Sequence, residues 1–178
     1  MSSDSPSSPD RFCAPSSSKL APFNPTDASA QALAFDSLRL SPGDVLYDLG
    51  CGDGRFLVYA SDEMARRGGG GGGRCRCIGV EYDAVYARRA EEAAGGYDNV
   101  VIMHADVLDV DLADATAVFV YLVPEGLKLC EEKLLGVLRR GGRVASYMFS
   151  LPGLEPKETF SSKGGCKVRF YDQSCVAE

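Results

Sequence analysis

The stretch from Asp44 to Tyr59 constrains the fold more than any other part of this sequence. It reads D-V-L-Y-D-L-G-C-G-D-G-R-F-L-V-Y: an apolar strand, a loop with glycines at Gly50, Gly52 and Gly54, and then a helical pattern. A strand, a glycine-rich turn and a helix in direct succession are typical of a nucleotide-type ligand site in a parallel sheet. This stretch therefore predicts an α/β fold that binds a cofactor.

The rest of the chain continues the alternation of strands and helices. A helix is expected after Pro22, with Ala28 and Leu38 on its apolar face and Asn24 or Thr26 as its cap. Further helices are expected at about 55–67, 83–94 and 124–138, strands at 45–49, 75–80, 100–103, 117–122 and 144–149, and an edge hairpin at 157–160 and 167–172. The sum is a doubly wound, mostly parallel seven-stranded sheet with a C-terminal antiparallel hairpin.

Two segments fall outside this pattern. Residues 1–21 are rich in Ser and Pro and lack apolar periodicity, so we expect a disordered tail followed by one domain over 22–178. Six consecutive glycines, Gly68 to Gly73, are interpreted as an expanded loop between a helix and a strand.

Composition excludes several classes of function. The net charge of −6 disfavours nucleic acid as a partner, and no apolar run reaches the roughly 18 to 20 residues that span a bilayer. The seven cysteines include no C-x-x-C pair, and the single histidine, His104, is expected to be structural, so no metal site is predicted. We expect reduced thiols in an intracellular monomer, cytoplasmic or alternatively mitochondrial.

Polar side chains follow several of the predicted strands. Ligands of an open parallel sheet bind outside the carboxyl ends of its strands, where this sequence has Asp48, Glu81, Asp106 and Tyr121. Glu81 lies 27 residues after Gly54, or 21 once the six glycines are subtracted, which suits a carboxylate that accepts ribose hydroxyls.

The glycine loop itself distinguishes between two kinds of cofactor. Dinucleotide sites favour G-x-G-x-x-G without a neighbouring acid, whereas this loop is G-C-G-D-G-R, with Arg55 in the place of the last glycine and with Asp48 and Asp53 beside it. Negative charge there repels a pyrophosphate. It suits a ligand with an amino group, a sulfonium, ribose and adenine, which is S-adenosylmethionine.

The motifs D-L-G-C-G-D-G, V-E-Y-D and the H-A-D that ends at Asp106 resemble successive motifs of class I S-adenosylmethionine-dependent methyltransferases, which are Rossmann-like. By this resemblance, Asp48 and the loop hold the methionine part, Glu81 holds the ribose, and Asp106 with Val107 holds the adenine. The implied cofactor-binding residues are Asp48, Gly50, Cys51, Gly52, Asp53, Gly54, Glu81, Tyr82, Asp106 and Val107, with Cys51 interpreted as a small packing residue.

A narrower resemblance extends from Ala21 to about Asp172. It is carried by A-P-F-N-P-T, A-T-A-V-F-V-Y-L-V-P, G-G-R-V-A-S-Y-M-F and L-P-G-L-E-P. These resemble small methyltransferases that include the mitochondrial lysine methyltransferases of ATP synthase c subunit and of adenine nucleotide translocase, and their bacterial relatives. The resemblance implies a protein substrate methylated on lysine. The mitochondrial members carry an apolar N-terminal segment that this sequence lacks.

Methyl transfer to lysine requires a deprotonated amine in a water-poor channel. Phe23, Tyr121 and Pro124 are the expected rim, which would lower the pKa of an ammonium by desolvation, and Tyr121 is the expected catalytic residue, acting through its hydroxyl or its ring face. The Asn/Asp-Pro-Pro-aromatic motif of amide and adenine methylation is replaced by Tyr121-Leu-Val-Pro. A small-molecule or RNA methyltransferase, or a binding module without transfer activity, stays open as an alternative.

Overall fold

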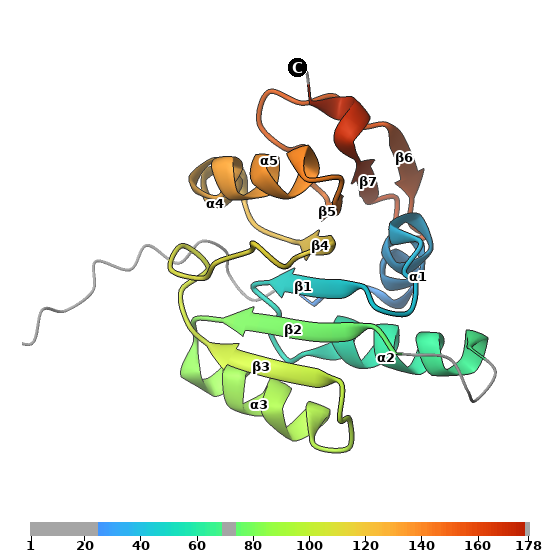
Figure 1. Cartoon of the computed structure of the whole chain (residues 1–178), viewed down its shortest axis with the longest axis vertical. Coiled ribbons are helices and arrows are strands. Elements are labelled where there is room, and N and C mark those ends of the chain that lie inside the picture. The colour runs from blue at the N-terminus through green and yellow to red at the C-terminus, as the bar shows by residue number, and fades with distance from the viewer. Residues whose placement is uncertain (1–24, 69–73, 177–178) are drawn as a thin grey trace, which may run out of the picture.

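A seven-stranded sheet forms the centre of the protein in a computed structural model that describes residues 25–68 and 74–176 (Figure 1). The strand order is β3-β2-β1-β4-β5-β7-β6. The first five strands are parallel, and β7 runs antiparallel to both β5 and β6. The strands are β1 Val45–Leu49, β2 Arg76–Glu81, β3 Val100–His104, β4 Ala117–Val120, β5 Arg143–Tyr147, β6 Glu158–Ser161 and β7 Lys167–Tyr171. The predicted parallel sheet with a C-terminal hairpin is confirmed.

Helices cover both faces of this sheet. On one face, α1 (Ala28–Leu38), α2 (Arg55–Arg67) and α3 (Ala84–Ala94) enclose a core that includes Phe56 and Phe119. On the other, α4 (Pro124–Leu129) and α5 (Glu131–Arg139) cover a second core with Leu49 and Val118. A 3₁₀ turn, Gln173–Cys175, follows β7. Burial from both sides explains why β1, β2 and β4 are apolar along almost their whole length.

The parallel register brings the carboxyl ends of neighbouring strands to one edge of the sheet, called the carboxyl edge below. Leu49 is paired with Val80 and with Val120, and Glu81 is paired with His104. The residues that follow β1, β2, β3 and β4 therefore lie close together at this edge, which is where open parallel sheets bind their ligands.

The cap of α1 differs from the prediction. Asp27, and not Thr26, is the N-cap, with Oδ1 accepting a hydrogen bond from Ala30 N at 2.9 Å. Thr26 contributes its carbonyl oxygen, which accepts from Gln31 Nε2 at 2.9 Å. Asp27 has the extended backbone (φ −68°, ψ 154°) directly before the first helical residue that a capping side chain needs. Asn24 lies outside the described residues.

The helix predicted over 124–138 is two helices that meet at Cys130. Cys130 N donates to Gly126 O, Leu134 N donates to Cys130 O, and Cys130 itself (φ −91°, ψ 0°) breaks the regular helix between them. β4 also ends two residues earlier than expected, at Val120, so Tyr121 stands in the connection to α4. The predicted disordered tail at 1–21 and glycines 69–73 lie outside the described residues.

Candidate functional site

The loop after β1 is folded across the end of β2 by its backbone. Gly50 N and Cys51 N both donate to Val80 O, at 2.8 and 3.0 Å. Gly50, Gly52 and Gly54 have φ of 79°, 57° and 76°, a region that side chains rarely adopt. The spacing of the three glycines is thus explained by the path of the chain.

Close packing also fixes the loop from behind. A Cβ on Gly54 would lie 3.1 Å from the Cβ of Ala90 on α3, and one on Gly79 would lie 2.7 Å from Cys51 Sγ. Cys51 is 7% exposed, and burial raises the pKa of its thiol. Its side chain packs in the core, as the sequence suggested, so only its backbone faces the carboxyl edge.

The carboxylate of Glu81 joins the loop to the start of α3. Oε2 accepts from Gly52 N at 2.9 Å, and Oε1 accepts from Asp83 N at 2.8 Å. These two bonds hold the carboxylate in one orientation. Each oxygen has a second lone pair, so the group has the capacity to accept hydrogen bonds from a diol as well.

Asp48 is the most deeply buried acid of the site, with 3% of its surface exposed. Desolvation, followed by the charges of Glu81 and Asp53, raises its pKa well above the usual carboxyl range. Asp53 is different, because a hydrogen bond from Arg55 lowers its pKa, and the two form an ion pair of 2.5 Å. The loop therefore gathers carboxylates around Asp48, and Arg55 offsets one of them.

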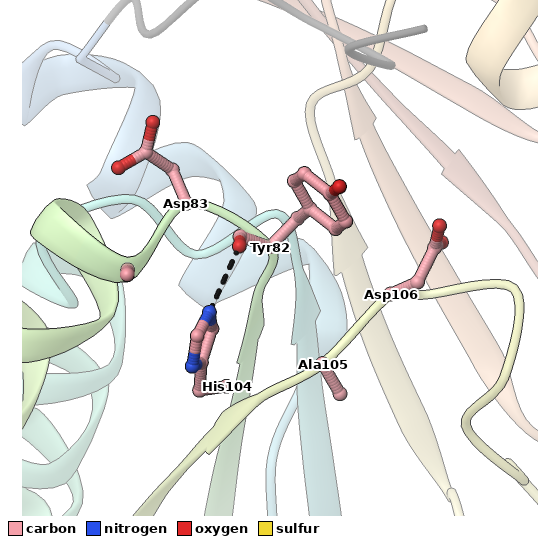
Figure 2. Close-up of a pocket in the computed structure, with 6 residues that line it drawn as sticks. Tyr82, Asp83, His104, Ala105 and Asp106 are labelled. Atoms are coloured by element: carbon pink, nitrogen blue, oxygen red, sulfur yellow. Dashed lines mark hydrogen bonds between the residues drawn. The ribbon is translucent and has the colours of Figure 1, made fainter. Parts of the chain in front are cut away.

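A pocket of about 510 Å³ lies beside Glu81, where β2 and β3 end (Figure 2). Figure 2 shows the Tyr82 ring and the Asp106 carboxylate projecting beyond the two strands. His104 Nε2 lies 3.1 Å from Tyr82 O, and Asp106 Oδ1 accepts from Leu108 N at 2.9 Å. The lining residues are Tyr82, Asp83, Ala84, His104, Ala105 and Asp106.

Three of these residues refine the predicted set. Asp83 and Ala84 were missed, although both directly follow Glu81 and Tyr82 in the sequence. His104 has the structural contact that was expected, and its ring also lines the pocket. Val107 is 4% exposed and its side chain packs in the core, so it could meet a ligand only through its backbone.

The other end of the carboxyl edge is aromatic. Tyr121, directly after β4, donates a hydrogen bond to Met148 Sδ at 2.8 Å, and its ring packs edge-on against Tyr147 at 4.8 Å between centroids. Tyr147 in turn donates to Asp27 Oδ2 at 2.8 Å. Burial, followed by its hydrogen bonds to Cys166 and Asp27, raises the pKa of Tyr147, which keeps it protonated as a donor. Together, Tyr121, Tyr147, Met148 and Asp27 are called the aromatic cluster below.

Sequence reasoning found only Tyr121 of this cluster. Tyr147 is the last residue of β5, which pairs with β4, and Met148 directly follows it. Their place beside Tyr121 depends on this strand order, which the sequence alone does not give. Pro124 is exposed at the first turn of α4, and Phe23 lies outside the described residues.

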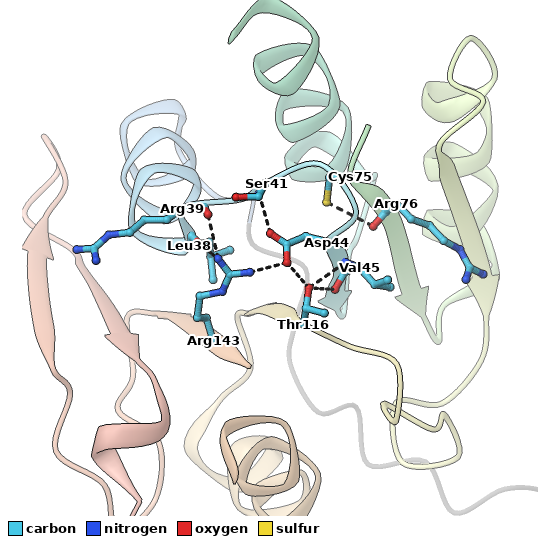
Figure 3. Close-up of polar contacts among 9 residues, drawn as sticks. All are labelled: Leu38, Arg39, Ser41, Asp44, Val45, Cys75, Arg76, Thr116 and Arg143. Atoms are coloured by element: carbon cyan, nitrogen blue, oxygen red, sulfur yellow. Dashed lines mark hydrogen bonds and ion pairs between the residues drawn. The ribbon is translucent and has the colours of Figure 1, made fainter. Parts of the chain in front are cut away.

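A second polar network, at the opposite edge of the sheet, has a structural role (Figure 3). Asp44 pairs with Arg143 at 2.6 Å and accepts from Thr116 Oγ1 at 2.6 Å, while Arg143 also donates to the carbonyls of Leu38 and Arg39. Burial alone would raise the pKa of Asp44, but the bonds from Thr116 and Arg143 hold it below its usual value. The network ties the end of α1 to the starts of β1 and β5.

In the ranges 25–68 and 74–176, no three His, Cys, Asp or Glu side chains are arranged to hold a metal ion. None of the helices described is both long and apolar enough to cross a bilayer.

Comparison with protein families gives a match to the ANTKMT methyltransferase domain over residues 48–158. A protein-lysine N-methyltransferase of Saccharolobus islandicus is 29% identical over 147 residues, which cover 81% of this chain and 86% of that protein. Adenine nucleotide translocase lysine N-methyltransferase of Mus musculus is 35% identical over 138 residues, covering 76% of this chain. This chain spans only 56% of the mouse protein.

A solved structure agrees with the sequence comparisons. An RNA methyltransferase from Salinibacter ruber, in complex with S-adenosyl-L-homocysteine, superposes with a TM-score of 0.70 at 29% identity. The alignment covers 83% of this chain and 92% of that one.

Proposed function

We propose that this chain, which belongs to the ANTKMT methyltransferase domain family, is an S-adenosylmethionine-dependent methyltransferase that acts on lysine side chains of a protein. The observation that carries the proposal is the convergence of Asp48, Glu81 and Asp106 at the carboxyl ends of three adjacent parallel strands. All three lie within the stretch that matches the family. The Salinibacter relative, an RNA methyltransferase that binds the demethylated form of the cofactor, supports the cofactor but not the acceptor.

The residues of the site fit this cofactor by charge. Asp48 is buried among other carboxylates, an arrangement that opposes a pyrophosphate and favours the cationic methionine part. Glu81, already oriented by two backbone N–H groups, would accept from the ribose hydroxyls. The pocket with Tyr82 and Asp106 would take the adenine.

When bound, S-adenosylmethionine supplies an electrophilic methyl group, whose carbon–sulfur bond breaks with its electron pair going to sulfur as an amine lone pair bonds the carbon. The protein must therefore present a neutral amine and exclude water. Tyr121 directly follows β4, whose last residue, Val120, is paired with Leu49 just before the glycine loop. We assign it to the acceptor, where its aromatic ring would favour loss of the ammonium proton to water by desolvating the amine.

Support for lysine as the acceptor comes from the two lysine methyltransferases among the relatives and from the acidity of the carboxyl edge. The carboxylates of Asp27 and Asp106 lie along this edge, so a segment that carries lysine is attracted to it. The same charge opposes the phosphates of RNA.

The proposal is tested by methyl transfer from S-adenosylmethionine with a labelled methyl group into a cell extract, followed by mass spectrometry of the labelled acceptors. Wild type is compared with Glu81→Ala and with Glu91→Ala, a control that removes an exposed acid from α3. Calorimetric titration gives the cofactor affinity of each variant.

We expect label on protein lysine with wild type and with Glu91→Ala. Glu81→Ala removes a charged hydrogen-bond partner, so its affinity for the cofactor should fall about 10- to 100-fold. Label in RNA or in metabolites alone would overturn lysine as the acceptor. Cofactor binding without any label would favour a binding module.

A further inference from the structure

Met148 has a backbone conformation that is unusual for its residue type. It directly follows β5 and has a φ of 66°, in the left-handed region that favours glycine. Its N–H donates to Lys167 O at 2.7 Å, and its carbonyl accepts from Arg169 Nη1 at 2.6 Å. Both partners belong to β7, so the antiparallel strand holds Met148 in a conformation that costs free energy. Such strain is concentrated at functional sites.

The side chain of Met148 meets the residue assigned to the acceptor. Its Sδ accepts a hydrogen bond from the Tyr121 hydroxyl, with 2.8 Å between the oxygen and the sulfur. A thioether has no proton to donate, so the direction of this bond is fixed by chemistry. With its proton directed at sulfur, the Tyr121 oxygen can act towards an amine only as an acceptor.

Tyr121 is held from a second side by the rest of the aromatic cluster. The edge-on ring of Tyr147 packs against it, and Asp27 fixes the Tyr147 hydroxyl. Asp27 is fixed in turn, because it caps α1 and accepts from Ser29 Oγ at 2.6 Å. Ser29 Oγ also accepts from Lys163 N in the hairpin turn. The end of β5 therefore contacts the Tyr121 ring directly, and α1 and the turn between β6 and β7 support that contact through Asp27 and Ser29.

We propose that Met148 is a positioning residue for methyl transfer, which rests on the proposed function above. By accepting a hydrogen bond from the Tyr121 hydroxyl, the thioether orients the Tyr121 oxygen to accept a hydrogen bond from an N–H of the acceptor amine. A primary amine held through one N–H has less freedom to rotate, so its lone pair spends more time in an orientation that can react. The strained backbone keeps the thioether in place.

A double-mutant cycle tests whether Met148 acts through Tyr121. Met148→Leu keeps the volume and removes the acceptor atom, while Met148→Gln keeps an acceptor at similar length. Met103→Leu is the matched control, since Met103 is exposed on β3, away from the aromatic cluster. Each variant is made in the wild type and in Tyr121→Phe, and kcat, KM for the acceptor and affinity for S-adenosylmethionine are measured.

In the wild-type background, we expect Met148→Leu to lower kcat about tenfold and to leave the cofactor affinity unchanged. In the Tyr121→Phe background, the same substitution should lower kcat by less than about twofold. Met148→Gln should retain most of the activity. A second readout does not use activity: in protein labelled with ¹³C at the tyrosine ζ carbon, the Tyr121 signal, assigned by its loss in Tyr121→Phe, should shift in Met148→Leu and stay in place in Met103→Leu.

The outcomes separate this inference from the proposed function. Equal losses from Met148→Leu in both backgrounds, or an unmoved Tyr121 signal, would overturn the positioning role alone. Transfer by the wild type to an atom other than nitrogen would overturn it together with lysine as the acceptor. No transfer by the wild type, with a Tyr121 signal that still moves, would overturn the methyltransferase proposal and leave only the Tyr121–Met148 contact established.

Discussion

The buried carboxyl group of Asp48 opposes the stability of the ligand-free protein. Desolvation and the charges of Glu81 and Asp53 raise its pKa, so the folded state binds the Asp48 proton more tightly than the unfolded state does. The contribution of this group to stability is therefore largest at low pH, and it is lost as the pH rises from the unfolded value of about 4 through the folded-state pKa. We expect Asp48→Asn to stabilise the ligand-free protein at pH 8 by about 1 to 3 kcal/mol.

The measurement is thermal unfolding of wild type and Asp48→Asn between pH 5 and 8, with Asp109→Asn as the control on an exposed acid. The advantage of Asp48→Asn should grow with pH, and the control should follow the wild type. Affinity for S-adenosylmethionine should move in the opposite direction, because the amide has no charge for the methionine part. A variant less stable than wild type at pH 8 would show that the carboxylate is stabilised in the fold.

Contact between α2 and α3 depends on Gly54 having no side chain. Gly54 and Gly153 both have positive φ, 76° and 64°, but only Gly54 has a neighbour within 4 Å of an added Cβ. Gly153→Ala should therefore cost about 1 to 2 kcal/mol from the backbone alone. Gly54→Ala should cost about 1 to 3 kcal/mol more, because Ala90 must move. Urea unfolding gives the free energy of unfolding of each variant. Equal losses of stability in the two variants would mean that α3 moves away from Gly54 at no cost.

Elements that are specified locally were predicted well. Each parallel strand is a short apolar run between polar or glycine-rich segments, and the three glycines Gly50, Gly52 and Gly54 predict the turn after the first strand. The break at Cys130 could not be seen, since Leu127, Leu134 and Leu138 keep facing the core on both sides of it. The choice of Asp27 as cap depended on a backbone conformation that several neighbouring polar residues could have adopted.

The site divides in the same way. Asp48, Glu81 and Asp106 follow from their place at strand ends, because parallel strands share one carboxyl edge. Met148 and Tyr147 became visible only when the sheet order placed β5 beside β4 and inserted β7 next to it. The periodicity of the sequence predicts where strands lie along the chain, but it does not predict which strands pair with each other in the sheet.

For the molecule as a whole, binding of the right cofactor should appear as a gain in stability. A ligand of the native state at about 100 times its Kd adds about 2.7 kcal/mol, or roughly 5 to 10 °C for a chain of this size. We expect this shift with S-adenosylmethionine and S-adenosylhomocysteine in thermal unfolding. NAD at the same concentration should give none, because carboxylates surround the loop. A larger shift with NAD would reverse the assignment of the loop.

The insertion of β7 between β5 and β6 sets an order of events for the chain as it is synthesised. β5 has no neighbour on its outer side, and β6 has none at all, until residues 167–171 have left the ribosome. The adenosyl side of the site uses only β1, β2 and β3 and can form earlier. The backbone of Met148 is held by Lys167 and Arg169, so its conformation is fixed only after these two residues have been synthesised. The half of the site assigned to the methyl acceptor is therefore the last to be completed during translation.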